Sequence, residues 1–152
     1  MAQIEISAEV KAARDVVFQA FGDFRNAARH VSGIDQLEVL GEDPIGIGTR
    51  FRETRTMFKR QMTEEMEITG WEPGRSYTVE GDSCGCHFTT RFDFDGHPDG
   101  TQVRVTAESR PISLLAKLLS PLSGLMMGPM KKCIQQDIED LRLMLESPNR
   151  AK

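Results

Sequence analysis

Six consecutive segments with the alternation of β-strands follow one another between residues 34 and 109. In the fifth of them, Phe92 and Phe94 fall on one face and Arg91 falls on the other. A period of two residues is typical of a strand that is buried on one side only. The six segments span residues 34–40, 48–58, 62–71, 75–81, 86–95 and 101–109. Because short turns separate them, they predict an antiparallel meander with one face toward solvent.

The segments on either side of this meander complete an α+β architecture. Residues 3–10 alternate in the same way and predict a first strand, which should pair with the last strand and close the edge of the sheet. Residues 12–24 and 24–31 predict two short helices after that strand. Residues 129–146 predict a long C-terminal helix, whose apolar stripe must cover the apolar face of the sheet.

Length and composition restrict the class of protein. The 152 residues suit one domain, expected over residues 1–147, with a frayed tail at 148–152. The formal net charge of −4 gives no overall basic surface, so no nucleic-acid partner is expected. The three cysteines cannot all pair within the chain, and the first residues lack the pattern of a secretory signal. A reducing cytoplasm is therefore the expected location.

The stretch over residues 111–130 is almost entirely apolar, with Lys117 as its one charge. A membrane-spanning helix needs about 20 uninterrupted apolar residues, whereas this stretch is broken by prolines and glycines. We expect no membrane span but a broken helical segment over residues 111–128, with helix restarts at Ser120–Pro121 and Gly128–Pro129. Three roles remain open: a lid over a ligand site, a kinked helix packed on the sheet, or a transient contact with a membrane.

The sequence Cys84-Gly85-Cys86-His87 raises the question of a metal site. Zinc sites usually place two to four residues between paired cysteines and add a second ligand pair elsewhere. Here a single residue separates the cysteines, and Cys133 is the one further thiol. We therefore expect neither a metal nor another cofactor.

Few polar side chains are candidates for acid–base chemistry. Of the histidines, His87 is expected on the solvent face and His97 in a turn, so His30 in the second short helix is the one candidate. Tyr77 could donate its phenol to a ligand carbonyl. The full set of weak catalytic candidates is Tyr77, Glu53, Arg55 and His30.

The strand at residues 48–58 allows more than one arrangement. If Phe51 faces the interior, Glu53 and Arg55 share its face, and a buried pair of this kind would indicate a functional site. In the opposite orientation of the strand, the interior side chains are those of Arg52, Thr54 and Thr56. We favour a ladder of salt bridges on the solvent face, with partners on the next strand at Glu64, Glu65 and Glu67.

Several phrases, taken in order, resemble the START-like, or SRPBCC, superfamily, and its polyketide cyclase/dehydrase-like branch in particular. They are IEISAEV, ARDVVFQAF, GIGTRFRE, EITGWEPGRSYTVEG, FDFDGHPDGTQVRVT and IQQDIEDLRLML, spread over residues 3–146. The resemblance implies a helix-grip fold, in which a curved seven-stranded antiparallel sheet wraps around the C-terminal helix and leaves a cavity between them. It also implies an apolar ligand in that cavity, with no catalytic triad common to all members.

The side chains predicted to face inward are the candidates for lining this cavity. They are Phe51, Met66, Ile68, Tyr77, Val79, Cys86, Phe88, Thr90, Phe92, Val103, Val105, Leu122, Met126, Met127, Met130 and Ile134. Small residues at Gly81 and Ala107 should leave room, and the eight methionines of the chain favour an adaptable apolar surface.

These observations predict that the protein binds, or binds and transports, a hydrophobic or amphipathic small molecule that is lipid- or polyketide-like. One alternative is an enzyme of the cyclase or dehydrase type that works without a metal. Another is a protein-interaction module of the same fold, with residues 118–128 as its contact surface. The sequence sets neither the ligand nor the oligomeric state.

Overall fold

The computed structural model describes residues 2–57, 59–83, 85–118 and 120–146, with their side chains except those at 2, 57, 116 and 120–127. The strands are β1 (Ala2–Val10), β2 (Gln36–Leu40), β3 (Arg50–Met57), β4 (Arg60–Glu72), β5 (Ser76–Ser83), β6 (Cys86–His97) and β7 (Gly100–Pro111). The helices are α1 (Arg14–Phe21), the short 3-10 helix η1 (Phe24–Asn26), α2 (Ala27–His30), α3 (Leu114–Leu118) and α4 (Ser120–Glu146). The tail expected at 148–152 lies outside the described residues.

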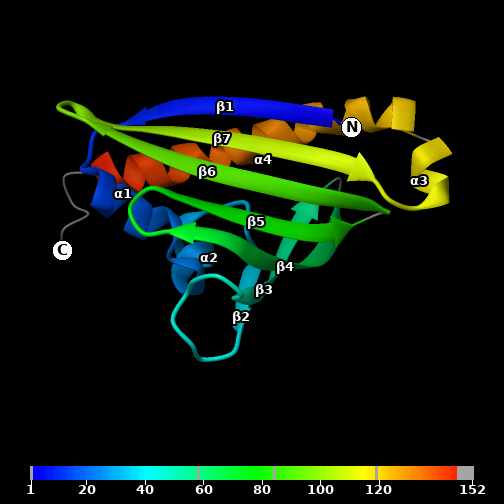
Figure 1. Ribbon diagram of the computed structural model, residues 1–152, viewed down its shortest axis with the longest axis horizontal. Coiled ribbons are helices and arrows are strands. Elements are labelled where there is room, and N and C mark those ends of the chain that lie inside the picture. The colour runs from blue at the N-terminus through cyan, green and yellow to red at the C-terminus, as the bar shows by residue number, and fades with distance from the viewer. Residues whose placement is uncertain (1, 58, 84, 119, 147–152) are drawn as a thin grey trace.

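The strands form one antiparallel sheet in the order β1-β7-β6-β5-β4-β3-β2. β1 pairs with β7 along its whole length, with Ile6 opposite Val105, so the first strand closes the edge of the meander as predicted. Figure 1 shows the curved sheet with α4 lying behind β1 and β7 along the long axis of the molecule. The predicted helix-grip α+β fold, with two short helices after the first strand, is confirmed.

The C-terminal half of α4 covers the apolar face of the sheet. Ile138, Leu141 and Leu145 are all buried, and Ile134 and Met144 are partly buried against the same core. Their spacing of three and four residues places them on one side of the helix. Each fully buried aliphatic side chain stabilises the fold by about 2 kcal/mol, so this stripe holds the helix against the sheet.

Helix α1 packs aromatic side chains into one end of the interior. The ring of Phe94 lies 5.4 Å from that of Phe18 and 5.5 Å from that of Phe21, both in edge-to-face geometry. A register shift in β4 after Ile68 aligns Trp71 with Tyr77, and Trp71 then contacts Phe18 at 5.0 Å. Such pairs add about 1 kcal/mol each beyond the area they bury. The interior next to α1 is therefore filled.

Of the two helix restarts predicted over residues 111–128, the described residues test only the second, and there the prediction is wrong. α3 ends at Leu118 and α4 begins at Ser120, and the restart expected at Ser120–Pro121 adjoins position 119, which lies outside the described residues. The second restart is absent, because α4 continues through Pro129. Gly128 has no Cβ to clash with the proline ring, so it can keep a helical conformation before Pro129.

Candidate functional site

The structure shows which side chains of β3 face the interior. Phe51 is 2% exposed and lies opposite Met66 of β4. Glu53 and Arg55 share the face of Phe51 and therefore point toward α4. The favoured ladder on the solvent face is wrong for these two residues. It does form on the other face, where Arg50 pairs with Glu65 and Glu67, and Arg52 pairs with Glu65 and Glu38.

Arg55 joins the sheet to the C-terminal helix. Its two terminal nitrogens donate to the two carboxylate oxygens of Asp137 on α4, at 3.0 and 2.6 Å. Its Nε donates to Glu53 Oε1 at 2.7 Å. The three side chains are only 14 to 22% exposed, so the contacts are shielded from bulk water. We call Glu53, Arg55 and Asp137 the interior ion cluster.

Charge in the interior ion cluster is unbalanced, because two carboxylates share one guanidinium. Burial raises the pKa of Glu53, and the nearby carboxylates of Asp137 and Glu64 raise it further, against the opposing effect of Arg55. Burial also raises the pKa of Asp137. Burial works against the charged form of Arg55, but its bonds to Asp137 and Glu53 outweigh this and raise its pKa. The arrangement holds a carboxyl group with an elevated proton affinity inside the protein.

Asp137 was not among the residues predicted from sequence. It lies directly before Ile138 and three residues after Ile134, at the edge of the apolar stripe of α4. An inward Arg55 needs an acidic partner from the element that covers it. The position of Asp137 beside the stripe was the sequence feature that indicated this partner. It could be used only once it was known that Arg55 faces the interior.

Tyr77 lies deep in the interior and its hydroxyl has a partner. The residue is 3% exposed, and the hydroxyl donates to the backbone oxygen of Phe21 at 3.2 Å. Its ring stacks on Phe92 with 4.6 Å between centroids. Burial, followed by the charges of Asp137 and Glu53, raises its pKa. The phenol is thus held by the backbone of α1.

The histidines lie apart from one another. His30 ends α2 and is half-buried. His87 lies on the outer face, as predicted, between Glu80 at 2.8 Å and Asp82 at 2.6 Å, and its bonds to these two carboxylates raise its pKa. His97 ends β6 at the hairpin and bonds to Glu9 at 2.6 Å.

The cysteines considered as metal ligands are only partly observed. Cys84 lies outside the described residues, while Cys86 and Cys133 are half-buried free thiols. Among the residues that the structure describes, no group of three or more histidine, cysteine or acidic side chains is placed to hold a metal ion.

The predicted lining residues divide into two groups by burial. Those toward the α1 end and the centre of the sheet are buried: Phe51, Ile68, Tyr77, Val79, Val103 and Val105. The half-buried ones lie toward the β5–β6 hairpin, on α4 and, for Phe92, beside Tyr77 and Phe21: Met66, Cys86, Phe88, Thr90, Phe92, Met130 and Ile134. The remaining three, Leu122, Met126 and Met127, have side chains outside the described set. We call the half-buried group the inner surface.

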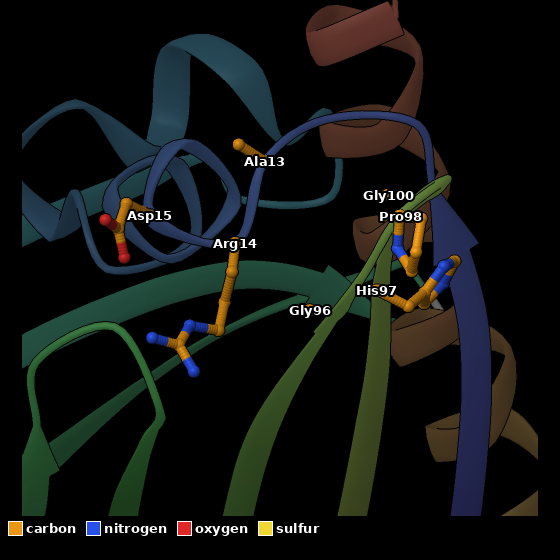
Figure 2. A pocket seen from close by; sticks show the side chains of 7 residues that line it. All are labelled: Ala13, Arg14, Asp15, Gly96, His97, Pro98 and Gly100. Atoms are coloured by element: carbon orange, nitrogen blue, oxygen red, sulfur yellow. The ribbon is translucent and has the colours of Figure 1, made fainter.

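The predicted cavity between the sheet and α4 is not observed in the part of the chain whose side chains are described. An open pocket of about 480 Å³ lies elsewhere, between the start of α1 and the β6–β7 hairpin (Figure 2). It is lined by Ala13, Arg14, Asp15, Gly96, His97, Pro98 and Gly100. The aromatic cluster next to α1 accounts for the filled interior on that side.

The empty space expected beside Gly81 is also occupied by neighbouring atoms. A Cβ on Gly81 would lie 2.9 Å from the backbone oxygen of Glu65 and 3.0 Å from Cγ of Met66, so β4 already occupies that space. Ala107 is 2% exposed within the packed core. At Gly81 the sequence prediction was wrong, because close strand packing and not an empty volume explains the small residue. The space expected beside Ala107 stays a prediction.

Seven antiparallel strands that grip a C-terminal helix, with two short helices after the first strand, define the START-like, SRPBCC-type fold. The family model described as "Polyketide cyclase / dehydrase and lipid transport" matches residues 1–146. The chain belongs to this family, as the resemblance in its sequence predicted. A search of the curated proteins found no match.

Solved structures share the fold at low sequence identity. TTHA0849 from Thermus thermophilus is 16% identical, with a TM-score of 0.75, 93% of this chain covered and 94% of that one. The di-domain ARO/CYC proteins BexL, from the BE-7585A biosynthetic pathway, and StfQ, from the steffimycin biosynthetic pathway, are each 12% identical. Their TM-scores are 0.80 and 0.79, with 96% and 95% of this chain covered. This chain spans 50% of the length of each di-domain protein.

Proposed function

We propose that this protein binds a hydrophobic or amphipathic small molecule, lipid- or polyketide-like, on the inner surface between the sheet and α4. The proposal places this site within one START-like domain over residues 1–147. A reducing cytoplasm is the proposed location, which the free thiols of Cys86 and Cys133 support.

The observation that carries the proposal is the incomplete burial of the inner surface. Phe88 and Phe92 point to the same side of the sheet as the fully buried Phe94, yet both are only partly buried, Phe92 even though its ring stacks on Tyr77. Large aromatic side chains gain most from burial. An apolar ligand that covered Phe88, Thr90 and Met66 would remove this surface from water, which stabilises the complex by about 25 cal/mol per Å².

The interior ion cluster supports an amphipathic ligand over a purely hydrocarbon one. Ion pairs inside an apolar site fix the position of polar groups. Glu53 and Asp137 together carry more negative charge than Arg55 neutralises, and Glu64 lies opposite Glu53 on the same face. A ligand hydroxyl or phenol that donates to one of these carboxylates would balance the site.

A second candidate is a cyclase or dehydrase type of enzyme, and the raised pKa of Glu53 favours it. A carboxyl group with an elevated pKa in an apolar site can act as a general acid or base. Glu53 would then exchange the proton, with Arg55 and Asp137 as positioning residues and Tyr77 or His30 as further candidates. The ARO/CYC names of BexL and StfQ agree with this chemistry.

The test compares two threonines on adjacent positions of β6 that face opposite sides. Thr90 lies on the inner surface, whereas Thr89 lies on the outer face and donates to Glu80. We expect Thr90→Trp to fill the site and to abolish binding of hydrophobic probes, and Thr89→Trp to leave binding unchanged. Mass spectrometry of ligands extracted from the purified protein, followed by thermal shifts with those ligands, provides the readout.

A bound ligand at a hundred times its Kd should raise the free energy of unfolding by about 2.7 kcal/mol. Equal binding by both tryptophan variants would contradict the proposed site. Conversion of the extracted ligand by the wild-type protein, lost in Glu53→Gln while binding persists, would establish the enzymatic alternative.

A further inference from the structure

Large apolar side chains are exposed in and just before α3. Leu114 is 77% exposed, Leu118 is 71% exposed, and Leu115 and Ile112 are also exposed. Single exposed leucines are ordinary, but four exposed aliphatic side chains within seven residues indicate an interaction site. We call Ile112, Leu114, Leu115 and Leu118 the α3 patch.

The α3 patch is held at one end of the molecule. The backbone N–H groups of Ile112 and Ser113 both donate to the carbonyl of Gly85, at 2.8 and 3.1 Å, which ties the segment to the β5–β6 turn. Figure 1 shows α3 beyond the tip of β7, at the end of the long axis. A flat surface can therefore reach these leucines without meeting the sheet.

The segment of the chain that carries the α3 patch is basic. Between Glu108 and Asp137 the sequence holds no acidic residue, but it holds four basic ones, in a chain whose net charge is −4. They are Arg110, Lys117, Lys131 and Lys132. Arg110 and Lys117 are exposed; Arg110 lies just before the patch and Lys117 lies within its span. In the neighbouring hairpin, the carboxylate of Asp82 is engaged by His87.

Exposed leucines flanked by basic side chains fit an anionic lipid surface. The apolar side chains enter the boundary between headgroups and acyl chains, and the basic groups lie over the phosphates. A second copy of this chain fits less well, because a symmetric contact would bring two basic copies of the same patch together. Within the described residues, no helix is long and apolar enough to cross a bilayer, so the contact would be peripheral.

We propose that residues 110–118 dock this protein on the surface of an anionic lipid bilayer. Leu114, Leu115 and Leu118 insert shallowly, and Arg110 and Lys117 provide the attraction to the headgroups. This docking surface goes beyond the proposed ligand site and does not depend on it.

Flotation with lipid vesicles tests the docking surface directly. Vesicles of phosphatidylcholine alone are compared with vesicles in which about a third of the lipid is phosphatidylglycerol. We expect binding to the anionic vesicles to be at least about tenfold stronger and to weaken as salt is added.

Matched variants separate the patch from the rest of the surface. The double variant Leu114→Ser, Leu118→Ser should lose about tenfold in binding, while Leu143→Ser, at a 54% exposed leucine on α4, should lose none. Lys117→Glu should lose about tenfold. Lys11→Glu, at the residue that follows β1, should match the wild type, because the C-terminal end of β1 lies far from α3 (Figure 1).

Four results would overturn the docking surface. They are the absence of flotation with either vesicle, equal binding to both, an equal loss in Leu143→Ser or Lys11→Glu, and a dimer in solution that the double leucine variant abolishes. Binding of hydrophobic probes measured without vesicles should be the same in the patch variants and the wild type. That measurement separates a failure of the docking surface from a failure of the ligand site.

Discussion

Arg55 determines the electrostatics of the interior. It is the shared partner of Glu53 on its own strand and of Asp137 on the helix that covers the sheet. Buried charges are tolerated when each has a partner, and they become costly when one partner is removed. Arg52, on the same strand, lies on the outer face and is about half exposed. The two arginines therefore contribute very differently to stability.

We expect Arg55→Met to lower the free energy of unfolding by about 3 kcal/mol at neutral pH, and Arg52→Met by less than about 1 kcal/mol. Without Arg55, the carboxylates of Glu53 and Asp137 remain in the interior without a cation. Burial already raises the pKa of both groups, and loss of Arg55 raises it further. Urea denaturation of the two variants and the wild type measures the difference.

The pH dependence of Arg55→Met follows from the direction of these shifts. A carboxyl group whose pKa is higher in the folded than in the unfolded protein favours folding at low pH, and this contribution is lost as pH rises through the folded pKa. The deficit of Arg55→Met should therefore be largest at neutral pH and shrink as Glu53 and Asp137 become protonated. A deficit that grows on acidification would contradict this account of the cluster.

At the scale of single elements, the sequence predicted some features well and others not at all. Alternation indicated the strands and their faces wherever one face is apolar, as in β6 with Phe92 and Phe94. It could not assign β3, because Arg52 on one face and Arg55 on the other both suit solvent. It also could not pair Arg55 with Asp137, 82 residues away, because that contact depends on how α4 crosses the sheet.

Helix α4 carries the clearest disagreement between sequence and structure. Proline is accommodated in the first turn of a helix, as at Pro121, but it removes one hydrogen bond in the interior, as at Pro129. The sequence therefore predicted a break that the structure does not contain. The continuous helix predicts that Pro129 costs stability and Pro121 does not.

We expect Pro129→Ala to raise the free energy of unfolding by about 1 to 3 kcal/mol, because the new N–H can join the helical hydrogen bonds. Pro121→Ala should change it by less than about 0.5 kcal/mol. Thermal unfolding followed by circular dichroism compares them. If the two substitutions had equal effects, or if Pro129→Ala were destabilising, a helix restart at Pro129 would be the better description.

At the scale of the whole molecule, the space between sheet and helix is uneven. Next to α1, rings such as Phe18 and Phe94 fill it, and toward the β5–β6 hairpin, residues such as Phe88 and Met66 are only partly buried. The resemblance to the START-like superfamily implied the fold correctly. It did not imply how much of the interior this chain fills, because that depends on side-chain volumes in three dimensions.

The central claim is that an apolar ligand binds on the inner surface. Methyl NMR during a titration with a hydrophobic probe tests it most directly, because the reporters Met66, Met130 and Ile134 lie on that surface and Ile47 is exposed elsewhere. The account predicts that the methyl signals of the three inner residues shift together and saturate while that of Ile47 stays in place. If the methyl signals of all three inner residues stayed unchanged at a saturating concentration of the probe, the claim would be contradicted.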